Sequence, residues 1–221
     1  MNPLNSAILF DLDGVTIDTE PLYTRSEIRL FREYGVEIPK EDLSLFRGSS
    51  EQEFFNLSID HYGIVEDRDI FIKKGRQYVM DEFSKNIPFV PGFKKLIKRI
   101  SSKHIVGLVT ASPLRSLNWI RKQIFLDRYF RYILSGEEVN NNKPHPDPYI
   151  HMMKKIGVNP ENTVIIEDSI IGLNSALASG AHVIALSGSV PQSKLLIAHR
   201  IVNHLDEITL KYIEDLLLVS I

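Results

Sequence analysis

The chain has 221 residues, longer than most single domains and shorter than two full ones, so we expect one large domain or a core that carries an insertion. Hydrophobic residues make up 43% and charged residues 24%, which excludes wholesale disorder. With 26 basic and 28 acidic residues, the formal net charge of −2 argues against a nucleic-acid partner, and the absence of cysteine excludes disulfides, thiolate zinc sites and a cysteine nucleophile.

No apolar run reaches the roughly 18 residues that span a membrane. Residues 1–10 lack the basic and long apolar parts of a secretory signal. We therefore expect a cytoplasmic protein without a membrane partner. No coiled-coil repeat or long exposed edge is evident, and we expect a monomer.

The first predicted element is a buried strand. Residues 6–10 form a short apolar run that ends abruptly at Asp11 and Asp13, which is typical of a strand buried on both faces of a parallel sheet. From about residue 19 to residue 86 the pattern becomes helical. Amphipathic stretches predict helices over residues 22–34, 50–61 and 69–83, with no convincing strand among them. This segment therefore predicts an all-helical unit.

After residue 88 apolar runs alternate with helical patterns. The predicted strands are 105–109, 132–134, 163–166, 182–186 and 201–202. The predicted helices are 93–100, 117–125, 148–156, 172–179 and 207–218. Such alternation predicts an α/β fold, a doubly wound, Rossmann-like parallel sheet with helices on both faces.

Four of the predicted strands are followed by residues that are mostly polar. They are Asp11 and Asp13 after the first strand, Thr110, Ala111 and Ser112 after the second, Lys143 in the loop after the third, and Glu167 and Asp168 after the fourth. Taken singly, each fits a turn, a helix cap or a solvated loop, and we expect Ser112 to cap the helix that follows it. Because the carboxyl ends of parallel strands meet at one edge of the sheet, the set is expected to converge on one site.

The chemistry of such a set points to phosphoryl transfer. Clustered carboxylates are costly to bury without a cation, and Mg²⁺ suits two or three carboxylates together with water and phosphate oxygens. A lysine and a hydroxyl donor fit a dianionic phosphoryl group. One aspartate could attack phosphorus as a nucleophile, and a second aspartate, two residues along the chain, could serve as general acid and base.

These motifs resemble the haloacid dehalogenase superfamily, in its phosphatase and phosphomutase branch with a helical cap. The first motif is matched by residues 10–15 and by Asp18-Thr19-Glu20, the second by residues 109–112, the third by residues 143–147, and the fourth by residues 167–169 with Gly172. The resemblance implies a core made of residues 1–15 and 88–221 and a helical cap made of residues 16–87.

The resemblance also implies a role for each residue at these motif positions. Asp11 would be the nucleophile and a metal ligand, and Asp13 the general acid and base with its backbone carbonyl on the metal. Thr110, Ala111 and Lys143 would hold the phosphoryl group, and Asp168 would ligate Mg²⁺ with Glu167 as a further ligand or a neighbour of the ligands. It implies further that Asp147 holds its loop and that the peptide bond before Pro144 is cis.

Asp13 argues for phosphoryl transfer over dehalogenation, because the dehalogenases lack this second aspartate. A phosphatase and a mutase are harder to separate. The fragment 46–51 resembles the specificity loop of β-phosphoglucomutases, which have an arginine at the position of Glu51 and a histidine at that of Tyr23, although Arg47 could substitute for the arginine. Glu20, Arg47, Gly48 and Glu51 are the candidate substrate residues of the cap.

The sequence thus predicts an Mg²⁺-dependent phosphatase acting on a small phosphorylated metabolite such as a sugar phosphate. A β-phosphoglucomutase-type phosphomutase is the alternative. A non-catalytic protein that binds a phosphorylated ligand is a third possibility, which the complete set of Asp11, Asp13, Lys143 and Asp168 disfavours.

Overall fold

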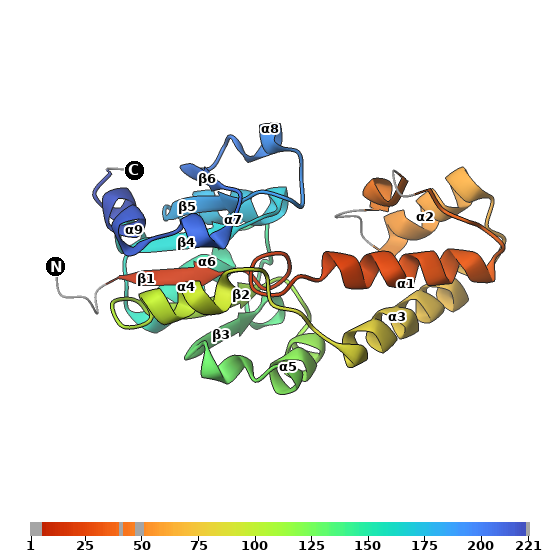
Figure 1. Ribbon diagram of the computed structural model, residues 1–221, viewed down its shortest axis with the longest axis horizontal. Coiled ribbons are helices and arrows are strands. Elements are labelled where there is room, and N and C mark those ends of the chain that lie inside the picture. The colour runs from red at the N-terminus through yellow and green to blue at the C-terminus, as the bar shows by residue number, and fades with distance from the viewer. Residues whose placement is uncertain (1–5, 40–41, 47–50, 220–221) are drawn as a thin grey trace. The chain divides into compact units, whose positions relative to one another are not determined.

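The structure is a computed structural model that describes residues 6–39, 42–46 and 51–219. The chain divides into two compact units (Figure 1). The first, here called the α/β unit, comprises Met1–Asp18 and Phe89–Ile221, and the second, the helical unit, comprises Thr19–Pro88.

The α/β unit is built on a parallel sheet. Among the described residues, six strands pair in the order β3-β2-β1-β4-β5-β6. They are β1 (Ala7–Phe10), β2 (Ile105–Thr110), β3 (Tyr132–Ser135), β4 (Thr163–Glu167), β5 (His182–Leu186) and β6 (Arg200–Val202). All five pairings are parallel, and β1 lies between β2 and β4. Successive strands are added on one side of β1 up to β3, and from β4 onward on its other side. Sheets of this kind bind ligands at such a point, here between the carboxyl ends of β1 and β4.

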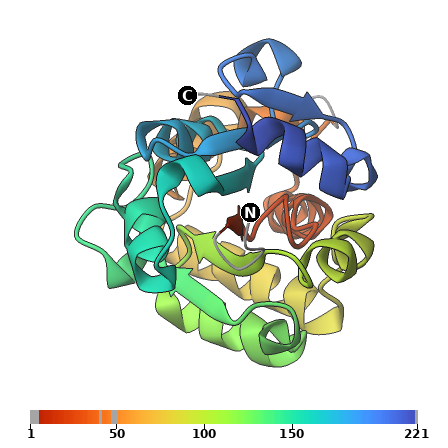
Figure 2. The same ribbon diagram turned by 90° about the vertical axis from the view of Figure 1, so that its left-hand side faces the viewer.

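Helices cover both faces of this sheet (Figure 2). They are α4 (Phe93–Ile100), α5 (Leu114–Gln123), α6 (Asp147–Ile156), α7 (Ile170–Ala178), α8 (Gln192–Leu195) and α9 (Leu210–Leu217). Helix α6 packs on β1, β2 and β3, and its neighbour α7 packs on β4 and β5. Helix α9 packs on β4 from the other face, on the side of α4. The predicted doubly wound α/β fold is confirmed.

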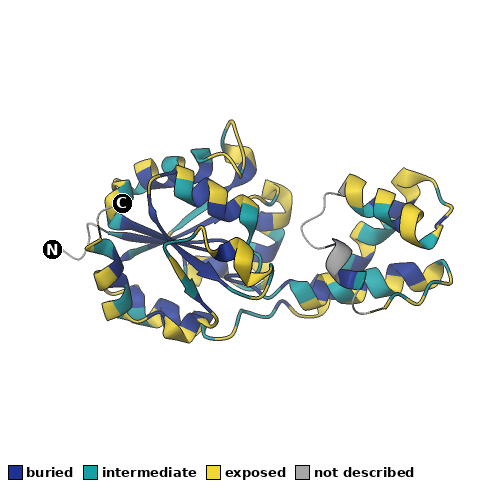
Figure 3. Ribbon diagram, turned by 90° about the horizontal axis from the view of Figure 1, so that it is seen from above, coloured by how far each residue is buried: buried dark blue, intermediate teal, exposed yellow. Residues whose placement is uncertain are grey.

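The central strands are buried on both faces (Figure 3). Every residue of β1, β4 and β5 is buried, which explains why their sequences are continuous apolar runs without alternation. In α4, by contrast, Phe93, Leu96, Ile97 and Ile100 are buried and the lysines between them are not, as the 3.6-residue period of a helix requires.

The last helix begins later than its sequence pattern predicts. The expected helix over 207–218 starts at Leu210, because Leu205–Glu207 forms a separate 3-10 turn and the Thr209 side chain caps α9 by accepting a hydrogen bond from Tyr212 N at 3.1 Å. Other 3-10 turns of this unit are Leu126–Arg128, Gly136–Glu138 and Pro160–Asn162. The short helix α8 had no periodic pattern that could predict it.

The helical unit contains α1 (Glu20–Glu33), a 3-10 turn (Asp42–Phe46), α2 (Glu51–Tyr62) and α3 (Arg68–Lys85). Its described residues form no strand, as the sequence predicts. The unit has its own core, in which Phe31 and Phe71 are fully buried among further aromatic rings. Asp67 starts α3 by accepting hydrogen bonds from Asp69 N and Ile70 N. No helix in the described ranges is both long and apolar enough to cross a membrane.

Candidate active site

Three carboxylates meet where β1 and β4 end. Asp11 directly follows β1, Glu167 is the last residue of β4, and Asp168 follows it. One oxygen from each of these three side chains lies within 4.8 Å of the others, and all three residues are buried. Because β1 and β4 are neighbours in register, with Phe10 opposite Ile166, the sheet itself sets this spacing.

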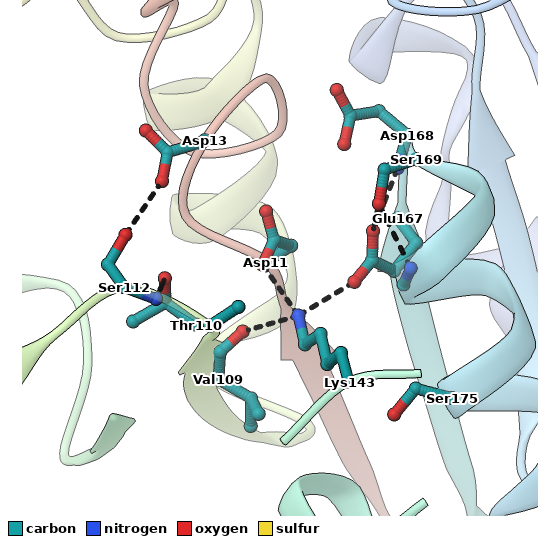
Figure 4. Close-up of polar contacts among 12 residues, drawn as sticks. Asp11, Asp13, Val109, Thr110, Ser112, Lys143, Glu167, Asp168, Ser169 and Ser175 are labelled. Carbon is teal, nitrogen blue, oxygen red and sulfur yellow. Dashed lines mark hydrogen bonds and ion pairs between the residues drawn. The ribbon is translucent and has the colours of Figure 1, made fainter. Parts of the chain in front are cut away.

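Lys143 lies between two of these carboxylates (Figure 4). Its Nζ donates to Asp11 Oδ1 at 2.6 Å, to Glu167 Oε1 at 2.7 Å and to the Val109 carbonyl at 3.0 Å. An ammonium group has three N–H donors, so these acceptors use all of them. Only 3% of the lysine side chain is exposed, and the ion pairs are therefore shielded from water.

Glu167 is the most heavily hydrogen-bonded of the carboxylates. Its Oε1 accepts from Lys143 and, at 2.7 Å, from the Tyr149 hydroxyl. Its Oε2 accepts from Asp168 N at 3.2 Å and from Ser169 Oγ at 3.3 Å. Gly172 passes directly beside this carboxylate, and a Cβ at that position would overlap all three of its atoms. A glycine is therefore required there.

The turn after β1 fixes Asp11 and brings Asp168 close. The Thr16 hydroxyl, which is fully buried, donates to the Asp11 carbonyl at 2.6 Å. Gly14 has a φ of 75°, and a Cβ on it would collide with the Asp168 carboxylate. That carboxylate also accepts a hydrogen bond from Ser189, in the loop after β5. The loop after β5 thus also contributes to the site.

The segment after β2 contacts the other aspartate of the first motif. Ser112 Oγ donates to Asp13 Oδ2 at 3.2 Å, and Ser112 N donates to Thr110 Oγ1 at 3.0 Å. The expectation that Ser112 caps α5 is wrong. Pro113 holds the N-cap position, and the first helical N–H, that of Leu114, is bound instead by Glu137 Oε2 at 2.9 Å.

The lysine loop is held at several points. Asn142 donates to the Ala111 carbonyl at 3.1 Å and accepts from Lys143 N at 2.8 Å, so it ties this loop to the segment after β2. Asp147 accepts from Asn141 at 2.9 Å, in agreement with its expected role of holding the loop. The Lys143–Pro144 peptide bond is cis, as the resemblance implies.

The electrostatics of the cluster leave an excess of negative charge. Burial raises the pKa of Asp11 well above its ordinary value of 3.8; Lys143 opposes the rise, and Glu167 and Asp168 add to it. Burial, followed by the charge of Glu167, raises the pKa of Asp168 to about 7, although the bond from Ser189 acts to lower it. Burial acts to lower the pKa of Lys143, but Asp11 and Glu167 outweigh it and hold this pKa well above 10.5. The ammonium is therefore charged, and it pairs with two of the three carboxylates.

A divalent cation fits this donor set. Oxygen atoms of Asp11, Glu167 and Asp168 lie close enough together to hold one ion, and a hard cation would relieve the repulsion that adds to the rise in the pKa values of Asp11 and Asp168. Every predicted residue of the α/β unit is thus at or beside one cluster, with Asp13 joined to it through Ser112 and Thr110.

The cap residues are a different case. Glu20 begins α1 in the helical unit. Arg47 and Gly48 lie outside the described residues, as does the side chain of Glu51. The sequence reasoning also missed Thr16, Asn142, Tyr149 and Ser189, each of which contacts the cluster or its loops. Asn142, next to Lys143, could have been found by its adjacency; the others carry no local signal.

Residues 8–186 match the family model of haloacid dehalogenase-like hydrolases. The chain belongs to this family. A phosphorylated carbohydrates phosphatase of Thermotoga maritima is 30% identical over 175 residues, which cover 79% of this chain and 81% of the relative. Hexitol phosphatase B of Escherichia coli is 28% identical over 220 residues, covering 93% and 95%. The resemblance seen in the motifs is confirmed, and the chain is an enzyme of the phosphatase type.

Solved structures agree with this assignment. A crystal structure described as a putative beta-phosphoglucomutase from Thermotoga maritima has a TM-score of 0.78 at 28% identity, covering 89% of this chain and 94% of the other. A hydrolase of this family from Deinococcus radiodurans, solved with bound phosphate and sodium, has a TM-score of 0.81 over the full length of both chains. At 22% identity the second match shows the fold alone.

Proposed function

We propose that the chain is an Mg²⁺-dependent phosphatase that hydrolyses a small phosphomonoester, such as a sugar phosphate, through an aspartyl-phosphate on Asp11. The observation that carries the proposal is the buried cluster in which Lys143 bridges Asp11 and Glu167 beside Asp168. Burying so many charges is expensive, and such clusters are found mostly at sites that act on a charged substrate. The names of the relatives, a phosphorylated carbohydrates phosphatase and a hexitol phosphatase, support this class of substrate.

The metal ligands in this proposal are the carboxylates of Asp11 and Asp168 and the backbone carbonyl of Asp13, with Glu167 as a further candidate. Mg²⁺ in this place would supply charge neutralisation for the phosphoryl oxygens and orient them for an in-line displacement. The preference for Mg²⁺ over other cations rests on the all-oxygen donor set.

The reaction would proceed in two displacements. Lys143, Thr110 and Ala111 hold the phosphoryl group while a carboxylate oxygen of Asp11 attacks phosphorus. The bond from phosphorus to the ester oxygen breaks, and Asp13 gives its proton to that oxygen, so an alcohol leaves. Asp13 then takes a proton from water, whose oxygen attacks the same phosphorus. Asp11 is released as a carboxylate together with inorganic phosphate.

Residue 112 has a defined part in this scheme. The hydrogen bond from Ser112 to Asp13 holds the general acid beside the segment that binds the phosphoryl group.

We assign the helical unit as the cap that selects the leaving group, through Glu20, Arg47, Gly48 and Glu51. Closing such a cap would exclude bulk water from the site. Cytoplasmic location and a monomeric state stay predictions.

The test is phosphate release from a panel of sugar phosphates, nucleotides and 4-nitrophenyl phosphate, with Mg²⁺ or with EDTA. We expect hydrolysis that EDTA abolishes and that Asp11→Asn lacks. Activity that persists in EDTA or in Asp11→Asn contradicts the mechanism. Incubation with β-glucose 1-phosphate and a trace of the bisphosphate tests the mutase alternative, which glucose 6-phosphate formation well above hydrolysis would establish.

A further inference from the structure

Tyr149 places a hydroxyl group at the centre of the charged cluster. This residue lies on α6 and is fully buried. Its hydroxyl donates to Glu167 Oε1 at 2.7 Å, the same oxygen that Lys143 contacts. Its ring also lies beside the lysine, with Nζ 4.8 Å from the ring centroid. One side chain therefore touches both members of the Lys143–Glu167 ion pair.

The surroundings of the Tyr149 ring, unlike those of its hydroxyl, are apolar and would suit a phenylalanine. Its ring belongs to the apolar core cluster beneath the sheet, together with Leu9, Val109 and Met152. A hydroxyl placed in such surroundings costs free energy unless it is hydrogen-bonded, and here its acceptor is Glu167. Burial, followed by the negative charge of Glu167, raises the pKa of Tyr149 well above 10, so the phenol keeps its proton and acts as a donor.

We propose that Tyr149 is a positioning residue for phosphoryl transfer, whose hydroxyl fixes the Glu167 carboxylate so that Glu167 aims the Lys143 ammonium at the phosphoryl site. This inference rests on the proposed function. Oε2 of Glu167 is fixed by Asp168 N and Ser169, and Oε1 by Tyr149, so the carboxylate plane is fixed at both ends. Without the hydroxyl, Oε1 would be bound only by the lysine, whose position it is meant to set.

The effect of removing the hydroxyl can be stated in advance. Tyr149→Phe keeps the ring, its packing and its contact with the lysine, and removes only the O–H bond. Loss of a group that orients a neighbour of the reacting atoms typically costs about 10–100-fold, and we expect kcat to fall about tenfold while KM changes less than about twofold. The fall would come from the misaligned lysine, which matters most when charge develops on the phosphoryl oxygens.

The decisive experiment is a double-mutant cycle on wild type, Tyr149→Phe, Glu167→Gln and the double variant. Each is assayed with 4-nitrophenyl phosphate and Mg²⁺, and its unfolding is followed by heat. If Tyr149 acts through Glu167, the tenfold effect should shrink to less than about twofold in the Glu167→Gln background. Tyr78→Phe is the matched control, because Tyr78 also donates to a carboxylate, that of Glu33, but in the helical unit. It should leave kcat unchanged.

Two results would overturn the inference. One is a Tyr149→Phe enzyme with the kcat of wild type, and the other is an equal loss in both Glu167 backgrounds, which would mean that the hydroxyl acts independently of Glu167. Failure of the proposed function looks different, since wild type itself would then show no hydrolysis. In that event the affinity for inorganic phosphate, measured by titration calorimetry on the same four proteins, replaces kcat. Tyr149→Phe should then lower this affinity about tenfold in the wild-type background and less than about twofold in the Glu167→Gln background.

Discussion

The two units of the chain use charge in opposite ways. In the α/β unit, the side chains of Lys143, Asp11 and Glu167 are 3%, 12% and 0% exposed, and they form one buried network. In the helical unit, α1 and α3 are also joined by ion pairs, but each of these pairs has a cation whose side chain is 39–52% exposed. The Arg29–Asp81 pair has side chains 48% and 33% exposed.

This difference in burial distinguishes charges that serve a functional site from charges that only lie on the surface. Exposed ion pairs are worth about 0–1 kcal/mol and need no function to explain them. Buried ones often cost as much as they return, so a chain that retains them gains something other than stability. The α/β network is therefore expected to govern activity, and the pairs of the helical unit to have small effects on stability. The substitutions below test that comparison, from the largest expected effect to the smallest.

Asp11→Asn should remove the nucleophile and change little else. Asparagine has the same shape and can still accept from Lys143, so the fold should persist. We expect phosphate release to fall at least about 10³-fold, measured with 4-nitrophenyl phosphate under saturating Mg²⁺. Retained turnover in Asp11→Asn would break the comparison, because the buried network would then lack the role assigned to it.

Lys143→Met should damage both activity and stability. The methionine fills the space but leaves Asp11 and Glu167 buried without their cation, which costs about 3–5 kcal/mol when one partner of a buried pair is lost. Activity should fall about 10²–10³-fold, because a preorganised charge beside the phosphoryl group is lost. Urea unfolding and the aryl phosphatase assay measure the two effects. An unchanged unfolding free energy would contradict the burial argument.

Gly172→Ala probes the backbone that encloses the network. Its new Cβ would overlap the Glu167 carboxylate, so the glutamate must move and release Lys143. We expect a loss of about 1–3 kcal/mol and a fall of about tenfold in kcat. The matched control is Gly75→Ala in the interior of α3, where the nearest atom is Leu30 Cδ2 at 3.3 Å and the change should stay within about 1 kcal/mol. Equal effects at both glycines would contradict the distinction between the units.

Asp168→Asn should lower activity and raise stability, and the gain in stability should depend on pH. The pKa of Asp168 is raised from 3.8 to about 7, so the folded chain holds a proton that the unfolded chain has released, and wild type loses stability as the pH rises through this window. Asparagine cannot ionise. With EDTA present, Asp168→Asn should therefore melt higher than wild type at about pH 8, by more than it does at about pH 5.

The buried histidines do not affect the difference in melting temperature between wild type and Asp168→Asn. Burial lowers the pKa of His104 and of His182, which makes stability rise with pH below about 6.5, but both contributions are the same in wild type and variant. A difference between the two melting temperatures that stays constant across this pH range would show that folding does not raise the pKa of Asp168.

Asp81→Ala should have the smallest effect. It removes the acceptor of Arg29 at 2.7 Å on the exposed side of α1 and α3. We expect a change of at most about 1 kcal/mol in unfolding free energy and a kcat for 4-nitrophenyl phosphate within about twofold of wild type. A loss as large as that of Lys143→Met would erase the contrast between the two units.

The sequence predicts the fold well because its signals are local. Continuous apolar runs mark β1, β4 and β5, and the motif aspartates follow β1 and β4 by adjacency alone. The residue at which a helix begins is harder to predict. Helix α9 begins at Leu210 because Thr209 caps it, although the apolar pattern extends to earlier residues. Ser112 was misassigned as a cap since its partner, Asp13, is 99 positions away.

The missed residues share that cause. The sequence pattern predicts Tyr149 only as an apolar residue of α6. Its hydroxyl reaches Glu167 because α6 packs on β1, β2 and β3. Ser189 reads as a loop serine, and only the order of β4 and β5 brings it to Asp168. Contacts between distant segments depend on tertiary packing, which periodicity does not encode.

The central claim is that Asp11 of the buried network carries the phosphoryl group during turnover. The most direct measurement is the mass of the peptide containing Asp11 after wild type is mixed with 4-nitrophenyl phosphate and Mg²⁺ and quenched with acid during steady turnover. We expect a fraction of this peptide to gain the mass of one phosphoryl group, and none to do so in Asp11→Asn. Steady hydrolysis with an unmodified Asp11 peptide, or with the phosphoryl group on another residue, would contradict the account.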